Sequence, residues 1–124
     1  MGKKSVLIAE DSSVIQNLAR KILEQQEFEI LAVKNGKQVI EAIQDKHFDL
    51  IFMDITMPVM DGMECTAKIR AMKDSDMADV PIIAITGNAR NYSNEDFKKA
   101  GVTQVLQKPL NFDTLVKVAI QYTT

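Results

Sequence analysis

The chain has 124 residues, which is near the commonest length of a single domain, so we expect one domain over residues 1–124. Apolar residues make up 46% of the chain and charged residues 26%, a balance that excludes a disordered protein. Fifteen Lys and Arg residues oppose seventeen Asp and Glu residues, and this net charge of -2 argues against direct nucleic-acid binding. A single cysteine, Cys65, excludes an internal disulfide and a cysteine-cluster zinc site.

The apolar runs are far shorter than the roughly 20 residues that a membrane-spanning helix needs. The run after Lys3 and Lys4 is also too short for a signal peptide and ends in two acidic residues. We therefore expect no membrane segment and a cytoplasmic location.

Short apolar runs recur along the whole chain with longer amphipathic stretches between them. The runs cover residues 6–9, 30–33, 50–53, 82–85 and, more weakly, 102–106. Nearly continuous apolar runs of this length are typical of parallel strands that are covered on both faces.

The stretches between the runs show apolar residues at helical spacing. The predicted stripes are Val14, Ile15, Leu18, Ala19, Ile22 and Leu23; Val39, Ile40 and Ile43; Cys65, Ile69 and Met72; and Leu115, Val116, Val118 and Ala119. Residues 88–99 are mostly polar, with Ser93 and Asp96 spaced as a capping box and Gly101 as a stop signal. We interpret this stretch as a weakly anchored helix and a candidate mobile element.

Five strand units that alternate with five helix units indicate an α/β fold. Such alternation predicts a doubly wound, five-stranded parallel sheet with helices on both faces and right-handed crossovers. In open parallel sheets, ligands bind at the carboxyl ends of the strands.

Reactive side chains follow four of the five predicted strands. They are Glu10 and Asp11, then Asp54, then Thr86, and finally Lys108. Three carboxylates at one edge repel each other unless a cation lies among them, and oxygen ligands suit Mg²⁺. An aspartate beside Mg²⁺ and a lysine is a suitable nucleophile for phosphoryl transfer.

The same residues carry a resemblance to a known family. The segments are LIAED at 7–11, DLIFMDITMPVMDG at 49–62, PIIAIT at 81–86 and Lys108-Pro109. In this order and at these separations, the chain resembles the receiver domain of two-component response regulators over essentially its whole length. The resemblance implies a flavodoxin-like sheet with strand order 2-1-3-4-5, and a cis bond between Lys108 and Pro109.

The resemblance also implies a role for each site residue. Asp54 matches the aspartate that accepts a phosphoryl group from a phosphohistidine on a partner protein. Glu10, Asp11, Asp54 and the backbone carbonyl of Thr56 match the ligands of Mg²⁺, for which Mn²⁺ is an alternative.

Lys108 and Thr86 match the lysine and the switch hydroxyl that contact the phosphoryl group, and the backbone of Thr56 and Gly87 also binds it. The family often has an aromatic switch residue at the place of Val105, so the aromatic half of the switch is missing here. The side chains at Thr56 and Asn88 flank the phosphoryl site in the family and help to set its lifetime.

The implied partners are a sensor histidine kinase or a histidine phosphotransfer protein, and a downstream protein. The downstream protein is expected on the face formed by the fourth helix, fifth strand and fifth helix. Partner choice in the family depends on surface residues near the first helix, here residues 12–16 and Ile15 in particular. We expect a monomer, with dimerisation on phosphorylation left open, and either a stand-alone regulator or a receiver from a longer protein. In this interpretation the protein is a signalling switch, which catalyses only its own phosphorylation and dephosphorylation.

The same residues bear on three other functions. A phosphatase of the haloacid-dehalogenase type needs a second aspartate two residues after Asp54, where this chain has Thr56. An FMN-binding, flavodoxin-like protein needs N–H and hydroxyl donors after the first strand, where Glu10 and Asp11 would repel the flavin phosphate. A degenerate receiver that only binds partners would have lost the acidic pair, the acceptor or the lysine, and all are present.

Overall fold

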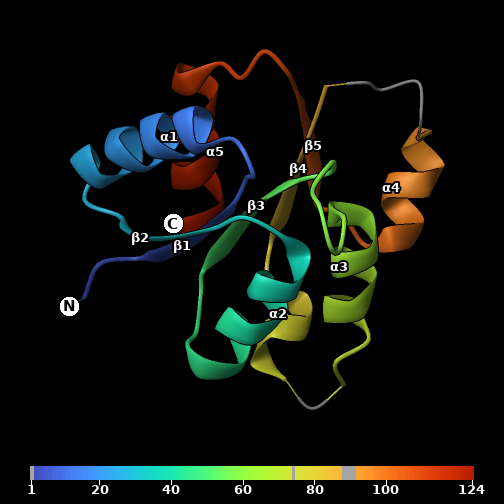
Figure 1. The fold of residues 1–124 in the computed structure, drawn as a ribbon. Helices are drawn as coiled ribbons and strands as arrows, with labels where there is room; N and C mark the ends of the chain where they lie inside the picture. The colour runs from blue at the N-terminus through green and yellow to red at the C-terminus, as the bar shows by residue number, and fades with distance from the viewer. Residues whose placement is uncertain (1, 74, 88–91) are drawn as a thin grey trace.

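The computed structural model describes residues 2–73, 75–87 and 92–124 (Figure 1). In chain order the elements are β1 (Ser5–Ala9), α1 (Ser13–Gln25), β2 (Glu29–Val33), α2 (Gly36–Asp45), β3 (Leu50–Asp54), α3 (Gly62–Arg70), the 3₁₀ helix η1 (Asp76–Asp79), β4 (Ile82–Thr86), α4 (Asn94–Ala100), β5 (Gln104–Gln107) and α5 (Phe112–Thr123). The strands form one parallel sheet in the order β2-β1-β3-β4-β5, which confirms the predicted fold and strand order.

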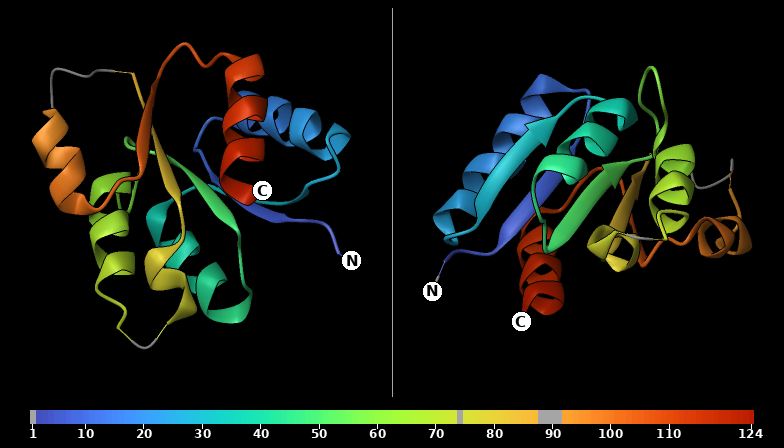
Figure 2. Two further views of the ribbon diagram at one scale, coloured as in Figure 1. Left: turned by 180° about the vertical axis from the view of Figure 1, so that it is seen from behind. Right: turned by 90° about the horizontal axis from the view of Figure 1, so that it is seen from below.

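The helices cover the two faces of the sheet in unequal groups. Helices α1 and α5 lie on one face, and α2, α3 and α4 lie on the other (Figures 1 and 2). Alternate side chains of β1 point to opposite faces of the sheet. Val6 and Ile8 pack with α1 and α5, whereas Leu7 and Ala9 pack with α2 and α3. Because both faces are covered, all residues of β1, β3 and β4 are buried, which explains their continuous apolar runs.

The strand register brings the polar residues to one edge. Ala9 lies opposite Met53 across β1 and β3, and Asp54 lies opposite Ile85 across β3 and β4. Thr86 lies opposite Gln107 at the end of β5. The residues that follow these positions therefore emerge together at the carboxyl edge of the sheet.

Two sequence predictions about packing are wrong in detail. The apolar stripe predicted for α1 included Val14 and Leu18, but these residues are 69% and 43% exposed. The face that packs on the sheet instead carries Gln16, Ala19 and Leu23, which are spaced three and four residues apart. Gln16, which we expected on the partner-binding surface, is therefore buried.

The last strand and the helix before it differ slightly from the prediction. Strand β5 begins at Gln104, two residues after the expected start of its apolar run. Helix α4 begins at Asn94, and residues 88–91 of the predicted segment lie outside the described residues. The predicted capping box between Ser93 and Asp96 is present, and Gly101 ends the helix with a φ of 96°.

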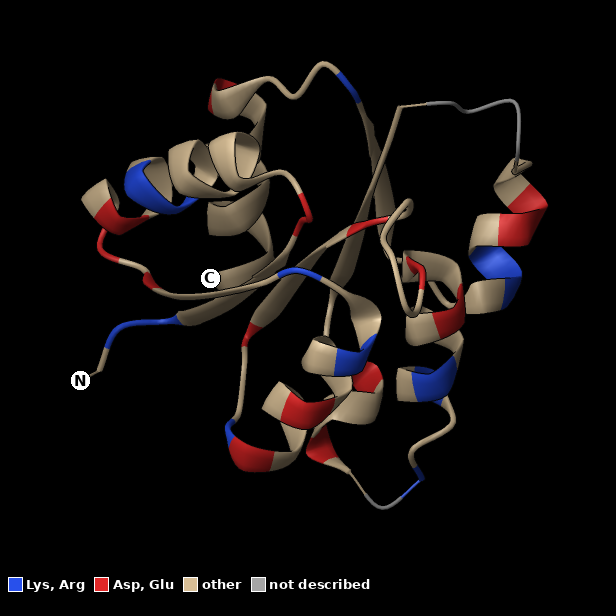
Figure 3. Cartoon of the chain, viewed as in Figure 1, with Lys and Arg blue, Asp and Glu red and all other residues tan. Residues whose placement is uncertain are grey.

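Helix α4 has little apolar anchorage. Its buried residue is Phe97, whose ring lies 5.8 Å from the ring of Tyr92. Its first turn is acidic and its last turn is basic, and charges in this arrangement interact favourably with the helix dipole at both ends (Figure 3).

In the part of the chain that the structure describes, no helix has the length and apolar character required to cross a membrane.

Candidate functional site

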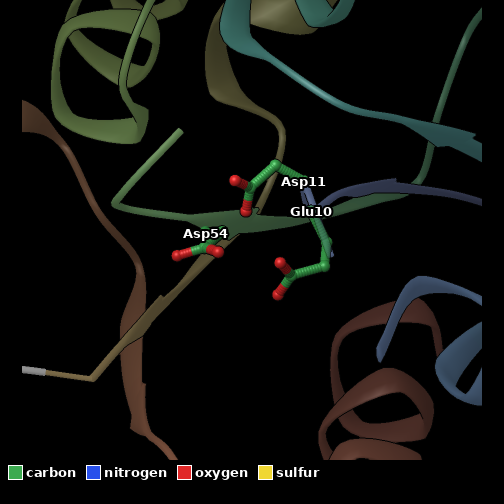
Figure 4. Close-up of side chains that lie close together, drawn as sticks. All are labelled: Glu10, Asp11 and Asp54. Atoms are coloured by element: carbon green, nitrogen blue, oxygen red, sulfur yellow. The ribbon is translucent and has the colours of Figure 1, made fainter. Parts of the chain in front are cut away.

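Three carboxylates meet at the carboxyl edge of the sheet. Glu10 and Asp11 follow β1, and Asp54 ends the neighbouring strand β3 (Figure 4). One carboxylate oxygen from each of the three lies within 4.8 Å of the others. Glu10 and Asp54 are only 3% and 1% exposed, whereas Asp11 faces solvent. The predicted acidic cluster is therefore formed, and it opens to solvent on the side of Asp11.

A lysine from the far strand reaches into this cluster. The backbone N–H of Lys108 donates to the carbonyl of Thr86 at 2.8 Å. This bond continues the β4–β5 ladder and fixes the position of the Lys108 backbone. Its Nζ donates to Asp54 Oδ2 at 3.0 Å and lies 3.8 Å from Glu10 Oε1. The structure thus brings together the four charged residues that the sequence predicted.

Burial and charge alter the acid–base properties of the cluster. Burial, together with the negative charge of Asp54, raises the pKa of Glu10 to about 7, although the N–H of Ser12 and the ammonium group of Lys108 oppose this. Burial lowers the pKa of Lys108, but the hydrogen bond and charge of Asp54 outweigh it, so this pKa lies above its usual value. Lys108 therefore stays cationic beside the acidic residues.

The donor set fits a hard divalent cation. Glu10 Oε1 is a buried oxygen with no hydrogen-bond partner among the described residues. Three carboxylates face one ammonium group, which leaves uncompensated negative charge at the opening of the site. Oxygen ligands in this number are the kind that Mg²⁺ binds while keeping several waters.

The carboxylate of Asp54 is held from the other side by the loop that follows it. Asp54 Oδ1 accepts a hydrogen bond from the backbone N–H of Thr56 at 3.1 Å. The loop then returns to the strand end, where the N–H of Gly62 donates to the carbonyl of Ile55 at 2.9 Å. Both oxygens of Asp54 are therefore oriented by identified donors.

The remaining predicted residues lie on the β4–β5 side. Thr86 is buried at the end of β4, and Gly87 is exposed beside the Lys108 side chain. Val105 lies opposite Ala84 in the sheet and is half-buried. Val105 and Tyr92 pack against the same small cluster, formed by Ile55, Ala84 and Phe97. The predicted flanking residue Asn88 lies outside the described residues, and the Lys108–Pro109 bond is cis as expected.

An apolar recess of about 300 Å³ adjoins the charged cluster. It lies between the first turn of α1 and the segment that joins β5 to α5. Its lining residues are Glu10, Ile15, Ile85, Lys108, Pro109, Leu110 and Phe112. The site therefore has a charged centre and an apolar border on one side.

Sequence reasoning did not identify one residue that contacts this region. Gln16 is buried in α1, and its side-chain amide donates to the backbone carbonyl of Glu10 at 3.2 Å. The available signal was its position three residues before Ala19 and seven before Leu23, which places an amide on the core face of the helix.

The chain was compared with known protein families, curated proteins and solved structures. Residues 6–120 match the response regulator receiver domain family. Hybrid signal transduction histidine kinase I of Dictyostelium discoideum is 34% identical over 120 residues, which are 93% of this chain but 7% of that kinase. The chain therefore spans only a small part of this relative. The polar-differentiation response regulator DivK of Brucella ovis is 28% identical, with 96% of this chain and 95% of that protein covered.

A solved structure agrees with this assignment. The receiver domain of the sensor histidine kinase PA1611 from Pseudomonas aeruginosa PAO1 superposes with a TM-score of 0.87 and 30% identity, covering 98% of both chains. That structure has a magnesium ion coordinated in its active-site cleft. With a family match over nearly its whole length and a shared strand order, this chain belongs to the response regulator receiver domains of two-component signalling systems.

Proposed function

We propose that Asp54 accepts a phosphoryl group from a phosphohistidine on a sensor histidine kinase or a histidine phosphotransfer protein. The observation that carries this proposal is the placement of Asp54, which is 1% exposed and lies 3.0 Å from the Lys108 ammonium group. A buried, oriented carboxylate next to a fixed cation is suited to act as a nucleophile toward phosphorus. The similarity to the receiver parts of histidine kinases supports the choice of phosphodonor.

In the proposed transfer, a carboxylate oxygen of Asp54 forms a bond to phosphorus while the phosphorus–nitrogen bond of the phosphohistidine breaks. The bonding electron pair stays with the imidazole nitrogen, which then takes a proton. Lys108 offsets the charge on the phosphoryl oxygens, and the hydroxyl of Thr86 donates a hydrogen bond to one of them. The backbone N–H groups of Thr56 and Gly87 are the further donors in this proposal.

Glu10, Asp11 and Asp54, with the backbone carbonyl of Thr56, would hold Mg²⁺, or Mn²⁺ in its place. The bound ion supplies charge neutralisation to the transferring phosphoryl group. The buried Oε1 of Glu10, which accepts no hydrogen bond from the described residues, supports this assignment, because a buried oxygen without a hydrogen bond is costly. Magnesium in the active-site cleft of the PA1611 receiver domain is consistent with it.

The proposed output is a change in partner binding. Phosphorylation adds charge and acceptor oxygens at Asp54, which draws Thr86 toward the site and shifts the neighbouring α4. The face formed by α4, β5 and α5 would then bind a downstream protein, with Val105 in the place of an aromatic switch residue. In this role the protein catalyses only its own phosphorylation and dephosphorylation, and we expect it in the cytoplasm.

The phosphodonor is proposed to approach over α1. Val14 and Leu18 are exposed on that helix, and Ile15 continues the apolar surface into the recess beside Lys108. Exposed apolar side chains next to a reactive centre suit a partner that must deliver a phosphoryl group there.

The proposal is tested by incubating the protein with acetyl phosphate, with and without Mg²⁺, and measuring its intact mass. We expect a metal-dependent gain of one phosphoryl group in the wild type. Asp54→Asn keeps the size of the side chain but removes the nucleophilic carboxylate, so this variant should gain no mass.

Asp49→Asn is the matched control. Asp49 precedes β3 and accepts a hydrogen bond from the Ser5 backbone at the opposite end of the strand. This variant should be phosphorylated like the wild type. Labelling of Asp54→Asn at another residue would contradict the assignment of the acceptor. No labelling of a folded wild type, together with no binding of beryllofluoride, would contradict the proposed function.

A further inference from the structure

A buried amide links the acidic turn after β1 to the end of the neighbouring strand. The side chain of Gln16 on α1 is 8% exposed. Its Nε2 donates to the carbonyl oxygen of Glu10 at 3.2 Å and to the carbonyl oxygen of Val33, at the end of β2, at 2.9 Å. The amide group therefore joins the turn after β1 to the end of β2.

One acceptor of this amide, the carbonyl of Glu10, belongs to the turn that carries the acidic pair, and the other, Val33, ends β2. The backbone N–H of Glu10 also donates to the Val33 carbonyl at 3.0 Å. The Val33 carbonyl therefore accepts hydrogen bonds from both the Glu10 backbone and the Gln16 side chain. After the turn, the N–H of Ser12 donates to Glu10 Oε2 at 2.9 Å. The direction in which Glu10 and Asp11 point thus depends on a turn that is fixed at its carbonyl by Gln16.

We propose that Gln16 is a positioning residue for divalent-cation binding, acting through the backbone of Glu10. This inference rests on the proposed Mg²⁺ site, because it assigns Gln16 the task of holding two of its ligands. Without the amide, the buried Glu10 carbonyl loses a donor, the Val33 carbonyl keeps only the Glu10 N–H, and the turn gains freedom to rotate. Substitution of residues that hydrogen-bond to metal ligands and orient them commonly changes the metal affinity, although these residues do not touch the ion.

Two variants separate the donor function of Gln16 from its volume. Gln16→Met fills the same space with no hydrogen-bond donor, so it tests the loss of both bonds. Gln16→Glu has the same shape but places a carboxylate against two carbonyl oxygens. We expect Gln16→Met to weaken Mg²⁺ binding by roughly tenfold, and Gln16→Glu to weaken it less, because the added negative charge attracts the cation.

Tyr122→Phe is the matched control. It removes the hydrogen bond from the Tyr122 hydroxyl to Gln104 Oε1, which is 2.9 Å long and joins α5 to β5. This variant also keeps its volume and loses a partly buried bond, but its bond lies away from the acidic turn. We expect its Mg²⁺ affinity to equal that of the wild type.

The experiment is an NMR titration of each 124-residue protein with MgCl₂, which gives a dissociation constant from the backbone amide of Asp11. Stability is measured in parallel by urea denaturation. Weaker Mg²⁺ binding in the Gln16 variants, with wild-type affinity in Tyr122→Phe, supports the inference. Equal affinity in all folded variants would overturn it and leave Gln16 a purely structural residue.

A readout on the wild type covers the case in which the Gln16 variants fail to fold. The side-chain amide resonances of Gln16 should shift during the titration with the same midpoint as Asp11. Resonances that stay fixed at saturating Mg²⁺ would overturn the inference. If the wild type binds no Mg²⁺ at all, the result contradicts both the proposed Mg²⁺ site and the proposed role of Gln16.

Discussion

A Cβ atom on Gly62 would lie 2.3 Å from the backbone carbonyl oxygen of Asp54, so α3 begins directly against the end of the strand that carries the candidate acceptor. The side chain of Met53 is also within 2.9 Å of that position. We predict that Gly62→Ala pushes the strand end away and lowers the free energy of unfolding by about 1–3 kcal/mol, as overpacking usually does. Phosphorylation by acetyl phosphate should slow in the same variant, because Asp54 moves relative to Lys108. Urea denaturation and intact-mass kinetics measure the two effects.

Gly87→Ala is the natural control for this substitution, since Gly87 borders the same site. A Cβ atom there would lie 3.5 Å from Cδ of Lys108, which is an ordinary van der Waals contact. The change should keep the stability within about 1 kcal/mol of the wild type, with any gain arising from a less flexible unfolded chain. Equal effects of Gly62→Ala and Gly87→Ala would contradict the close approach of α3 to the acceptor strand.

Lys108→Met should change stability and cation binding in opposite directions. Loss of the ammonium group leaves the buried Asp54 carboxylate without its 3.0 Å partner. Because the lysine side chain is partly exposed, we expect a loss of only about 1–2 kcal/mol in unfolding free energy, less than for a fully buried pair. Removing a positive charge from beside three carboxylates should strengthen Mg²⁺ binding by roughly a few fold.

The measurement is the rise in melting temperature on adding Mg²⁺, which should be larger in Lys108→Met than in the wild type. Lys117→Met removes a lysine from the exposed surface of α5 and serves as the control for loss of one charge. A smaller Mg²⁺ effect in Lys108→Met than in Lys117→Met would mean that the ammonium group does not compete with the cation.

Much of the site could be predicted because its residues follow strands that the sequence marks clearly. Asp54 and Thr86 end runs of apolar residues, and parallel strands must end at a common edge. The interaction of Lys108 with Asp54 follows from the same rule, although nothing local in the sequence indicates the distance between them. These residues are separated by 54 positions, and only the strand order brings them together.

The packing of α1 could not be predicted as well. Its apolar stripe is wider than the face that the sheet can cover, so the pattern included Val14 and Leu18, which are exposed. Gln16 was placed at the surface because the family resemblance assigns residues 12–16 to partner choice. Its burial depends on two carbonyl oxygens, at Glu10 and Val33, that meet only after β1 and β2 have paired.

Cys65 should be nearly inert in the folded protein. Its thiol is buried in α3 and contacts the carbonyl of Gly36 at 3.4 Å, and burial is the main cause that raises its pKa to about 12. The thiolate is the reactive form, so at pH 8 the folded protein should hold roughly a thousandfold less of it than the unfolded chain. Reaction with a disulfide reagent, followed with and without urea, measures the ratio. Rapid reaction without urea would mean that α2 and α3 separate readily.

Val59 lies in the loop after β3 with a φ of 69° and a side chain that is 76% exposed. A β-branched residue is strained in this left-handed region, and an exposed side chain recovers little of that cost through packing. Asn adopts the same backbone conformation more easily, so we predict that Val59→Asn raises the free energy of unfolding by about 1 kcal/mol.

Val59→Ala is the control for this prediction, because it shortens the side chain but still carries a Cβ atom. Its gain should be clearly smaller than that of Val59→Asn in urea denaturation at the same pH. A destabilised Val59→Asn protein would show that the loop does not hold its left-handed turn in solution. The loop also carries Thr56, whose N–H orients Asp54, so a stabilising Val59→Asn should leave the rate of phosphorylation by acetyl phosphate close to that of the wild type.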